Sequence, residues 1–253
     1  MILNELSQIG TLVLEEKQAA VIGLSIRNNY FRGDTIEQIT LWAKDNFRIL
    51  IFMIPDEPAI DTLCGLGYDF SKAKQKATQA CNNLENKCLR IISKLNIGDK
   101  ARTLRWHQLQ SNTAYCNSYA NLSELYENDQ SFRRDARNTT KQVMLAQETK
   151  LPIEQAIDIG VQFLIKELSF IINASKILEL DCASAYLYHR PLAIYRNLLD
   201  GRYLFTPPID SGYIVCELEQ NNILRNTIED SSAAVVGEVT SPSLIKSSTA
   251  FSK

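Results

Sequence analysis

Two apolar stretches decide the fold: AAVIGL at residues 19–24 and ILIFMI at residues 49–54. Continuous apolar runs of this length, rich in β-branched residues, are typical of strands that a parallel sheet buries on both faces. Between them, residues 34–46 carry apolar side chains at helical spacing behind Asp34, the predicted N-cap. Strand, helix and strand in succession form a βαβ unit, so we predict an α/β chain with a Rossmann-like start.

Further elements alternate along the chain in the same way. We expect a short helix at 57–66, a long helix at 71–95, a strand at 103–106, a polar helical stretch at 118–146, a helix at 153–172 and a strand at 183–188. Neither an internal repeat nor an interdomain linker is visible, which favours one mainly parallel, helix-flanked domain over residues 1–229. Residues 230–253 are rich in serine and lack periodicity, so a disordered tail is expected there.

Composition excludes several classes of protein. The 253 residues are 45% hydrophobic, with 27 Lys and Arg against 29 Asp and Glu and a net charge of −2, which argues against intrinsic disorder and a uniformly basic surface. Six cysteines without a CxxC pair and two histidines indicate no metal site and a reducing compartment. No cationic, apolar leader and no apolar run near the ~20 residues of a membrane span occur, so a cytoplasmic protein is expected.

Ser25 directly follows the first predicted strand, and ligands of open parallel sheets gather beyond the carboxyl ends of strands. Its hydroxyl is therefore either placed to react or merely begins a polar loop. A GxSxG elbow would need glycine at position 27, where Arg27 stands. A GxxxxGK[ST] phosphate loop is absent, and the glycines at 65 and 67 lack the third glycine of a dinucleotide fingerprint.

Three further residues could take part in chemistry. Glu167 lies on the flank of the apolar stripe of helix 153–172, where a carboxylate either reaches solvent or pairs with a cation such as a substrate ammonium. Tyr188 and His189 end a predicted strand, so each is either a proton-transfer group or an ordinary residue at a strand end.

The helix at 71–95 has a cationic stripe beside its apolar one. Such a stripe is either a solvated helix face or a surface for a phosphate backbone. Its members are Lys76, Lys87, Arg90 and Lys94.

Together these features resemble the tRNA-dependent cyclodipeptide synthases. The resemblance covers residues 18–195 and runs through VIGLS at 21–25, the NNYF segment at 28–31, the strand at 49–54, the LCGLGY segment at 63–68 and the basic helix. It ends with Glu167 and the pair Tyr188 and His189. With Asn28, that pair resembles the family branch that carries Asn, Tyr and His.

The resemblance implies a Rossmann-like domain similar to the catalytic domain of class I aminoacyl-tRNA synthetases, acting without ATP or another cofactor. Its partners would be two aminoacyl-tRNAs, and its product a cyclic dipeptide. Ser25 would accept the first aminoacyl group as an ester, Glu167 would hold the substrate ammonium, and Tyr188 would relay protons. Val21 and Gly23 would line the pocket for the first side chain, where the missing Cβ of Gly23 would leave room.

One departure stands out, because Phe163 occupies the position four residues before Glu167 where the family commonly has a tyrosine. Phenylalanine cannot hydrogen-bond a substrate amine, and Tyr186 is a possible substitute. An apolar first pocket predicts a hydrophobic first amino acid. We expect a monomer that binds neither DNA nor a membrane.

Two alternatives stay open from the sequence. One is a serine hydrolase or acyltransferase that uses Ser25 with His189, although no acidic partner for the histidine is identifiable. The other is a non-catalytic tRNA-binding protein, for which the basic helix would suffice. A synthetase proper is disfavoured, since HxGH-like and KMSKS-like segments are missing.

Overall fold

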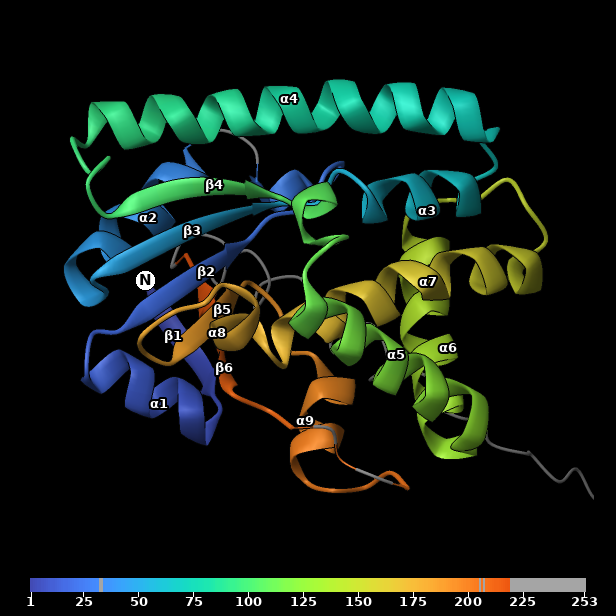
Figure 1. The fold of residues 1–253 in the computed structure, drawn as a ribbon. Coiled ribbons are helices and arrows are strands. Elements are labelled where there is room, and N and C mark those ends of the chain that lie inside the picture. The colour runs from blue at the N-terminus through green and yellow to red at the C-terminus, as the bar shows by residue number, and fades with distance from the viewer. Residues whose placement is uncertain (32–33, 205, 207, 219–253) are drawn as a thin grey trace, which may run out of the picture. The chain divides into compact units, whose positions relative to one another are not determined.

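Both apolar runs lie side by side as parallel strands in the sheet of the computed structural model (Figure 1). The structure describes residues 1–31, 34–204, 206 and 208–218. Within this part of the chain the sheet has six strands in the order β1-β6-β5-β2-β3-β4. Their bounds are Ile2–Leu6 (β1), Ala19–Gly23 (β2), Ile49–Ile54 (β3), Ala101–Arg105 (β4), Ser184–Tyr188 (β5) and Ser211–Glu217 (β6).

The strand order places the carboxyl end of β2 at a topological switch point. β2 pairs in parallel with β3 on one side and with β5 on the other. β4 and β6 continue the parallel sheet outward, and β1 closes one edge antiparallel to β6. The chain thus extends the sheet from β2 in one direction and, after β5, in the other. Ligand sites of open α/β sheets lie where the direction changes, and Ser25 follows β2 at that place.

Helices cover both faces of this sheet (Figure 1). On one face Val21, Ile51 and Tyr186 join an apolar cluster with α5, α6 and α7. On the other face Ile22 and Phe52 pack with α2 and α4. The helices are α1 Gln8–Glu15, α2 Thr35–Asn46, α3 Pro58–Gly65, α4 Phe70–Lys94, α5 Thr113–Asn128, α6 Gln130–Ala146, α7 Ile153–Ile171, α8 Ala174–Ile177 and α9 Ala193–Leu199, with 3-10 turns η1 Asn29–Phe31 and η2 Trp106–Leu109.

The predicted fold class is confirmed, since five parallel strands are flanked by helices. The predicted helical stretch at 118–146 is two helices, because Asp129 ends α5 and its carboxylate caps α6 by accepting from the backbone of Ser131 and Phe132. Asp34 stands at the N-cap of α2, but its side chain makes no capping hydrogen bond.

Met1–Leu218 form one compact unit. The predicted tail at 230–253 lies outside the described residues. Of the helices described, none is both long enough and apolar enough to cross a membrane.

Candidate active site

The loop after β2 presents Ser25 at the carboxyl edge of the sheet. β2 ends at Gly23, and Ser25 is half-buried. Two residues later Arg27 adopts a φ of +59°, in the left-handed region that non-glycine residues rarely enter. This turn leads into η1, and strain of this kind is often found at functional loops.

The Ser25 hydroxyl lies against a phenol from the neighbouring strand. Tyr188 ends β5, which pairs directly with β2, and its Oη is 3.0 Å from Ser25 Oγ. Burial raises the pKa of Tyr188 to about 12, so at neutral pH the phenol is protonated. Ser25 therefore has a neutral group beside it that can donate one proton while it accepts another.

Asn28 and His189 hold the loop against the end of β5. Asn28 Nδ2 is 3.3 Å from His189 Nε2, and its Oδ1 accepts from the backbone N–H of Tyr30 at 3.0 Å. The Tyr30 ring stacks on the His189 imidazole with centroids 4.2 Å apart and planes 13° apart. The imidazole thus supports the serine loop through Asn28 and Tyr30. The side chain that hydrogen-bonds to the serine hydroxyl is the Tyr188 phenol.

Glu167 approaches the same sheet face from α7. Its Oε1 accepts a hydrogen bond of 3.2 Å from the Tyr186 hydroxyl. Burial raises the pKa of the Glu167 carboxyl to about 7, and the hydrogen bond from Tyr186 opposes part of this rise. The carboxyl is therefore near the midpoint of its titration at neutral pH, and a substrate ammonium would favour its ionised form.

The space next to Gly23 differs from the prediction. A Cβ on Gly23 would lie 2.4 Å from the Cζ and Oη of Tyr186, so the missing Cβ makes room for this phenol rather than for open space. Val21 is fully buried in the cluster between β2 and α7. Phe163, on α7, is half-buried.

The predicted cationic stripe has partners within the protein. Lys87 Nζ donates to the backbone carbonyl of Phe31 at 3.2 Å, and Lys94 Nζ pairs with Glu37 of α2 at 2.6 Å. Lys76 Nζ lies 5.1 Å from the centre of the Tyr68 ring. Lys87 and Lys94 therefore tie α4 to the serine loop and to α2 in addition to any contact with a ligand.

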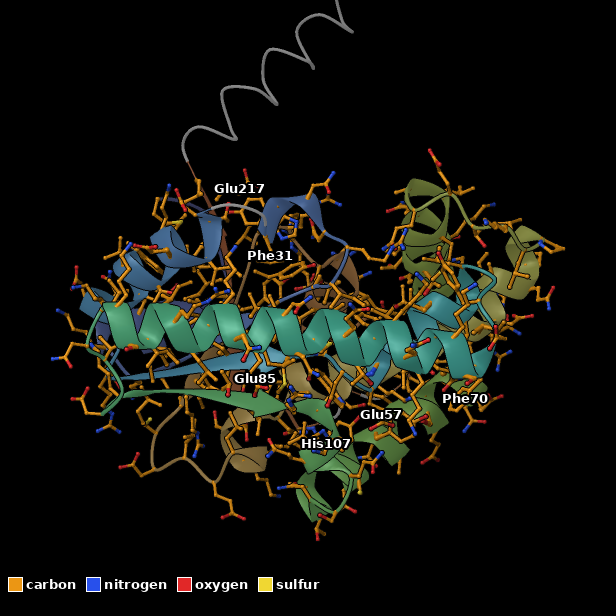
Figure 2. The ribbon with its side chains drawn as sticks, turned by 90° about the horizontal axis from the view of Figure 1, so that it is seen from above. Phe31, Glu57, Phe70, Glu85, His107 and Glu217 are labelled. Carbon is orange, nitrogen blue, oxygen red and sulfur yellow. The ribbon has the colours of Figure 1, made fainter. Side chains whose placement is uncertain are left out.

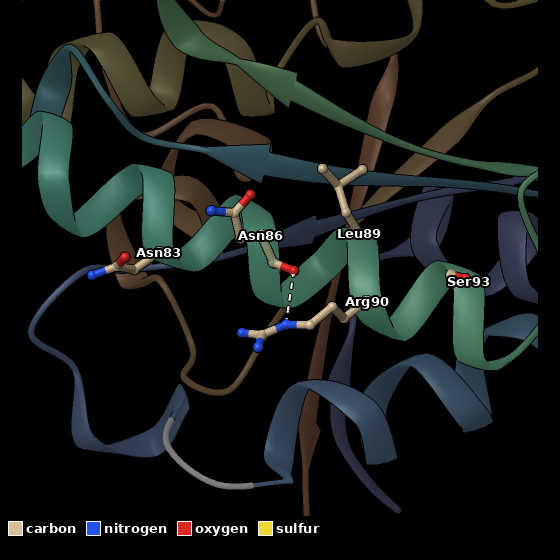
Figure 3. Close-up of a pocket in the computed structure, with 5 residues that line it drawn as sticks. All are labelled: Asn83, Asn86, Leu89, Arg90 and Ser93. Carbon is tan, nitrogen blue, oxygen red and sulfur yellow. Dashed lines mark hydrogen bonds between the residues drawn. The ribbon is translucent and has the colours of Figure 1, made fainter.

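Arg90 borders a hollow on the outer side of α4. Its Nε donates to the backbone carbonyl of Asn86 at 3.2 Å, as the dashed line in Figure 3 marks. Around the hollow, of about 680 Å³, lie Asn83, Asn86, Leu89, Arg90 and Ser93. Figure 2 shows α4 running across this side of the molecule, with Phe31 beyond one of its flanks and Glu85 and His107 toward the other.

Comparison with known proteins decides the family. The family model described as cyclodipeptide synthase matches residues 3–217. The chain belongs to the cyclodipeptide synthase family. A protein of Staphylococcus haemolyticus named cyclo(L-leucyl-L-leucyl) synthase is 22% identical over 219 residues, which are 85% of this chain and 93% of that protein.

Solved cyclodipeptide synthase structures have the same fold. A Mycobacterium tuberculosis protein, whose description relates these enzymes to type I tRNA synthetases, matches with a TM-score of 0.71 at 20% identity, over 83% of this chain and 89% of that one. A cyclodipeptide synthase of Candidatus Glomeribacter gigasporarum, solved bound to Phe-tRNAPhe, matches with a TM-score of 0.60 at 14% identity, over 97% of this chain and all of that one. The expected fold of a cyclodipeptide synthase is thus confirmed, and the likeness to type I tRNA synthetases is stated in the description of the Mycobacterium tuberculosis protein.

Within this cyclodipeptide synthase fold, Ser25, Asn28, Tyr188 and His189 come together, with Glu167 joined to them through β5. From the sequence, Tyr186 is only a possible substitute for the missing family tyrosine, and Tyr30 has no predicted role. The two-residue spacing of Tyr186 and Tyr188 could have placed both phenols on one face. His107, which had no predicted role, has its Nδ1 2.5 Å from Asp56 Oδ2. Among the described residues no cluster of three or more His, Cys, Asp or Glu could hold a metal ion.

Proposed function

We propose that this chain joins the aminoacyl groups of two aminoacyl-tRNAs into a cyclic dipeptide through a covalent intermediate on Ser25, without ATP. The observation that carries the proposal is the 3.0 Å contact between Ser25 Oγ and the Tyr188 hydroxyl at the switch point of a cyclodipeptide synthase fold. The proposal needs no nucleotide, because an aminoacyl ester is already activated.

In the first step Ser25 Oγ attacks the carbonyl carbon of the aminoacyl ester. The bond from Oγ to carbon forms, and the bond from carbon to the ribose oxygen breaks. The serine proton passes to the Tyr188 phenol while the phenol proton passes to the departing ribose hydroxyl. A phenol whose pKa is near 12 suits such a relay, because it remains protonated at neutral pH.

Glu167 receives the ammonium of the bound aminoacyl group. An ionised carboxylate in a poorly hydrated position attracts an ammonium more strongly than one in water does. For peptide-bond formation the ammonium must lose a proton, and a carboxyl with a pKa near 7 can accept it.

The second aminoacyl group is then transferred to the amine on Ser25. This amine attacks the second ester, a peptide bond forms, the second tRNA leaves and a dipeptidyl ester remains on Ser25. Attack of the terminal amine on that ester forms the second peptide bond, closes the six-membered ring and breaks the bond from carbon to Ser25 Oγ. The amine proton passes to the Tyr188 phenol while the phenol proton passes to Ser25 Oγ, which returns the hydroxyl. Every step is acyl transfer, so no oxidant is needed.

The tRNA lies along α4 in this proposal. Support comes from the cations Lys76, Lys87, Arg90 and Lys94, and from the related protein solved with Phe-tRNAPhe. The Asn28, Tyr188 and His189 contacts support assignment to the branch with those residues. The leucyl relative and the buried Val21 favour hydrophobic aminoacyl-tRNAs as the first substrates to test.

Incubation with a mixture of charged tRNAs, followed by mass spectrometry, tests the proposal. We expect cyclic dipeptides from the wild-type chain and none above background from Ser25→Ala, which cannot form the ester. With a radiolabelled aminoacyl-tRNA, the wild type should retain label on the protein after denaturation and Ser25→Ala should not. Absence of any cyclic dipeptide from the wild type would overturn the proposed reaction, and full activity of Ser25→Ala would overturn the covalent route.

A further inference from the structure

We propose that Tyr186 is a positioning residue that orients the Glu167 carboxylate, and that residue 23 is glycine in order to admit it. The inference rests on the proposed function and adds a residue to it. Tyr186 lies on β5, is 2% exposed, and donates its hydroxyl hydrogen to Glu167 Oε1 at 3.2 Å across the gap to α7. A strand residue therefore fixes a side chain that projects from a helix.

The ring of Tyr186 has little freedom to move. Its edge meets the Phe170 ring at 71° with centroids 6.5 Å apart, and its face stacks on Tyr213 at 26° with centroids 6.0 Å apart. On the β2 side the phenol end fills the space where a Cβ of residue 23 would lie, 2.4 Å from Cζ and Oη. Any side chain at position 23 would therefore displace the Tyr186 hydroxyl. Because that hydroxyl binds Glu167, the absence of a side chain at Gly23 permits the hydrogen bond to the carboxylate.

Two cations on α7 and α6, Lys166 and Arg137, are already paired with other groups. Lys166, its neighbour on α7, donates to Asp61 of α3 at 2.7 Å, and Arg137 of α6 pairs with Glu154 and Asp158 at the start of α7. The titratable or charged groups on the elements around α7 include Asp61 and Cys64 of α3, Tyr119 of α5, Arg137 of α6, Lys176 of α8, Tyr186 and Tyr188 of β5, and Tyr213 of β6. Among the described residues, the Tyr186 hydroxyl is the hydrogen-bond donor to the Glu167 carboxylate.

This geometry gives the hydroxyl two effects. By binding Oε1 it holds one carboxylate oxygen in place and leaves Oε2 for the substrate ammonium. By donating to the charged form it also favours ionisation against the effect of burial. The phenol thus keeps Glu167 anionic over a wider pH range than burial alone would allow.

Tyr186→Phe tests the inference, since it keeps the ring and removes the hydroxyl. The first measurement is the pKa of Glu167 by NMR of protein carrying 13C-labelled glutamate, with Glu167→Gln identifying the signal. We expect the pKa of Glu167 to rise by about one unit in Tyr186→Phe. This titration does not depend on catalysis, so it decides the role of Tyr186 even where the proposed reaction fails.

The second measurement is the pH dependence of Ser25 acylation by aminoacyl-tRNA. Acylation should fall as pH drops through the pKa of Glu167, and in Tyr186→Phe this fall should begin at a pH about one unit higher. Well above that pKa, the variant should recover most of the wild-type rate, whereas simple loss of structure would lower the rate at every pH. Gly23→Ala, which displaces the phenol, should shift the profile in the same direction.

Tyr195→Phe is the matched control. Its hydroxyl is also buried, but it donates to the backbone carbonyl of Ser211, and its removal should leave both the Glu167 pKa and the pH profile unchanged. The inference is overturned if Tyr186→Phe, folded by circular dichroism, has the wild-type pKa of Glu167 and the wild-type pH profile. A wild type that binds aminoacyl-tRNA but forms no ester would overturn the proposed function alone.

Discussion

Tyr186 and Tyr188 stand two positions apart on β5, so both phenols point to the same face of the sheet. Their ring centroids are 6.3 Å apart, yet one hydroxyl binds Glu167 and the other Ser25. Burial raises the pKa of each phenol, so both remain protonated at neutral pH. Because residues two positions apart on a strand share a face, β5 provides one neutral phenol for the Glu167 carboxylate and another for the Ser25 hydroxyl.

Glu167 lowers the stability of the fold at neutral and higher pH. Its pKa is raised from 4.5 to about 7 in the folded protein, so the folded chain binds more protons than the unfolded chain between these values. The free energy of unfolding therefore falls as pH rises through this window. We expect Glu167→Gln, which does not ionise, to be more stable than the wild type by about 1–3 kcal/mol at pH 8 and nearly equal to it below pH ~4.5.

Urea unfolding of both proteins at pH 4.5, 6 and 8 measures this difference. Glu124→Gln, at an exposed position of α5, is the control and should differ from the wild type by the same small amount at each pH. A stability difference for Glu167→Gln that does not change with pH would contradict the argument.

At the scale of elements, local sequence patterns predicted the strands and the helix that surround Ser25. β2, β3 and β5 are short apolar runs, and the buried stripe of α4 repeats every three or four residues, so each could be identified without its neighbours. The position of Ser25 follows from β2 alone. The partners of Lys87 and Lys94 could not be predicted, because Phe31 and Glu37 belong to elements whose packing against α4 is a long-range feature.

The elements missing from the prediction are those that long-range contacts define. β1 is a short edge strand whose register with β6 shifts between Leu3 and Glu5, so it lacks a regular alternation. α1 packs on β6 through two glycines far apart in sequence: a Cβ on Gly212 would lie 2.3 Å from the backbone nitrogen of Gly10. No pattern within either segment indicates this contact.

Gly212→Ala should therefore destabilise the fold. The obstructing atoms are backbone atoms of Gly10, which cannot rotate away as a flexible side chain could. We expect the free energy of unfolding to fall by about 1–3 kcal/mol. Gly98→Ala is the matched control, since the nearest atom to its Cβ would be 4.0 Å away. Urea unfolding compares the two, and equal stability of Gly212→Ala and the wild type would rule out the close packing of α1 on β6.

At the scale of the whole molecule, a net charge of −2 conceals an uneven distribution. α4 carries six cationic residues and one acid, Glu85, so the remainder of the chain has an acidic excess. Helix α4 packs on one sheet face and α8 on the other, as the two apolar clusters and Figure 1 indicate. A polyanion would therefore be attracted to one side of a molecule that is acidic overall.

Salt dependence distinguishes this local attraction from the effect of net charge. Lys76→Gln on α4 and Lys176→Gln on α8 each remove one positive charge, and both positions are exposed. If tRNA lies along α4, Lys76→Gln should reduce the slope of log K against log salt concentration by about one, because one fewer counterion is released, while Lys176→Gln should leave the slope unchanged. Filter binding of uncharged tRNA between 50 and 200 mM salt, roughly the range over which such slopes are resolved, measures both. Equal slopes for the two variants would mean that α4 is not the surface that neutralises the tRNA phosphates.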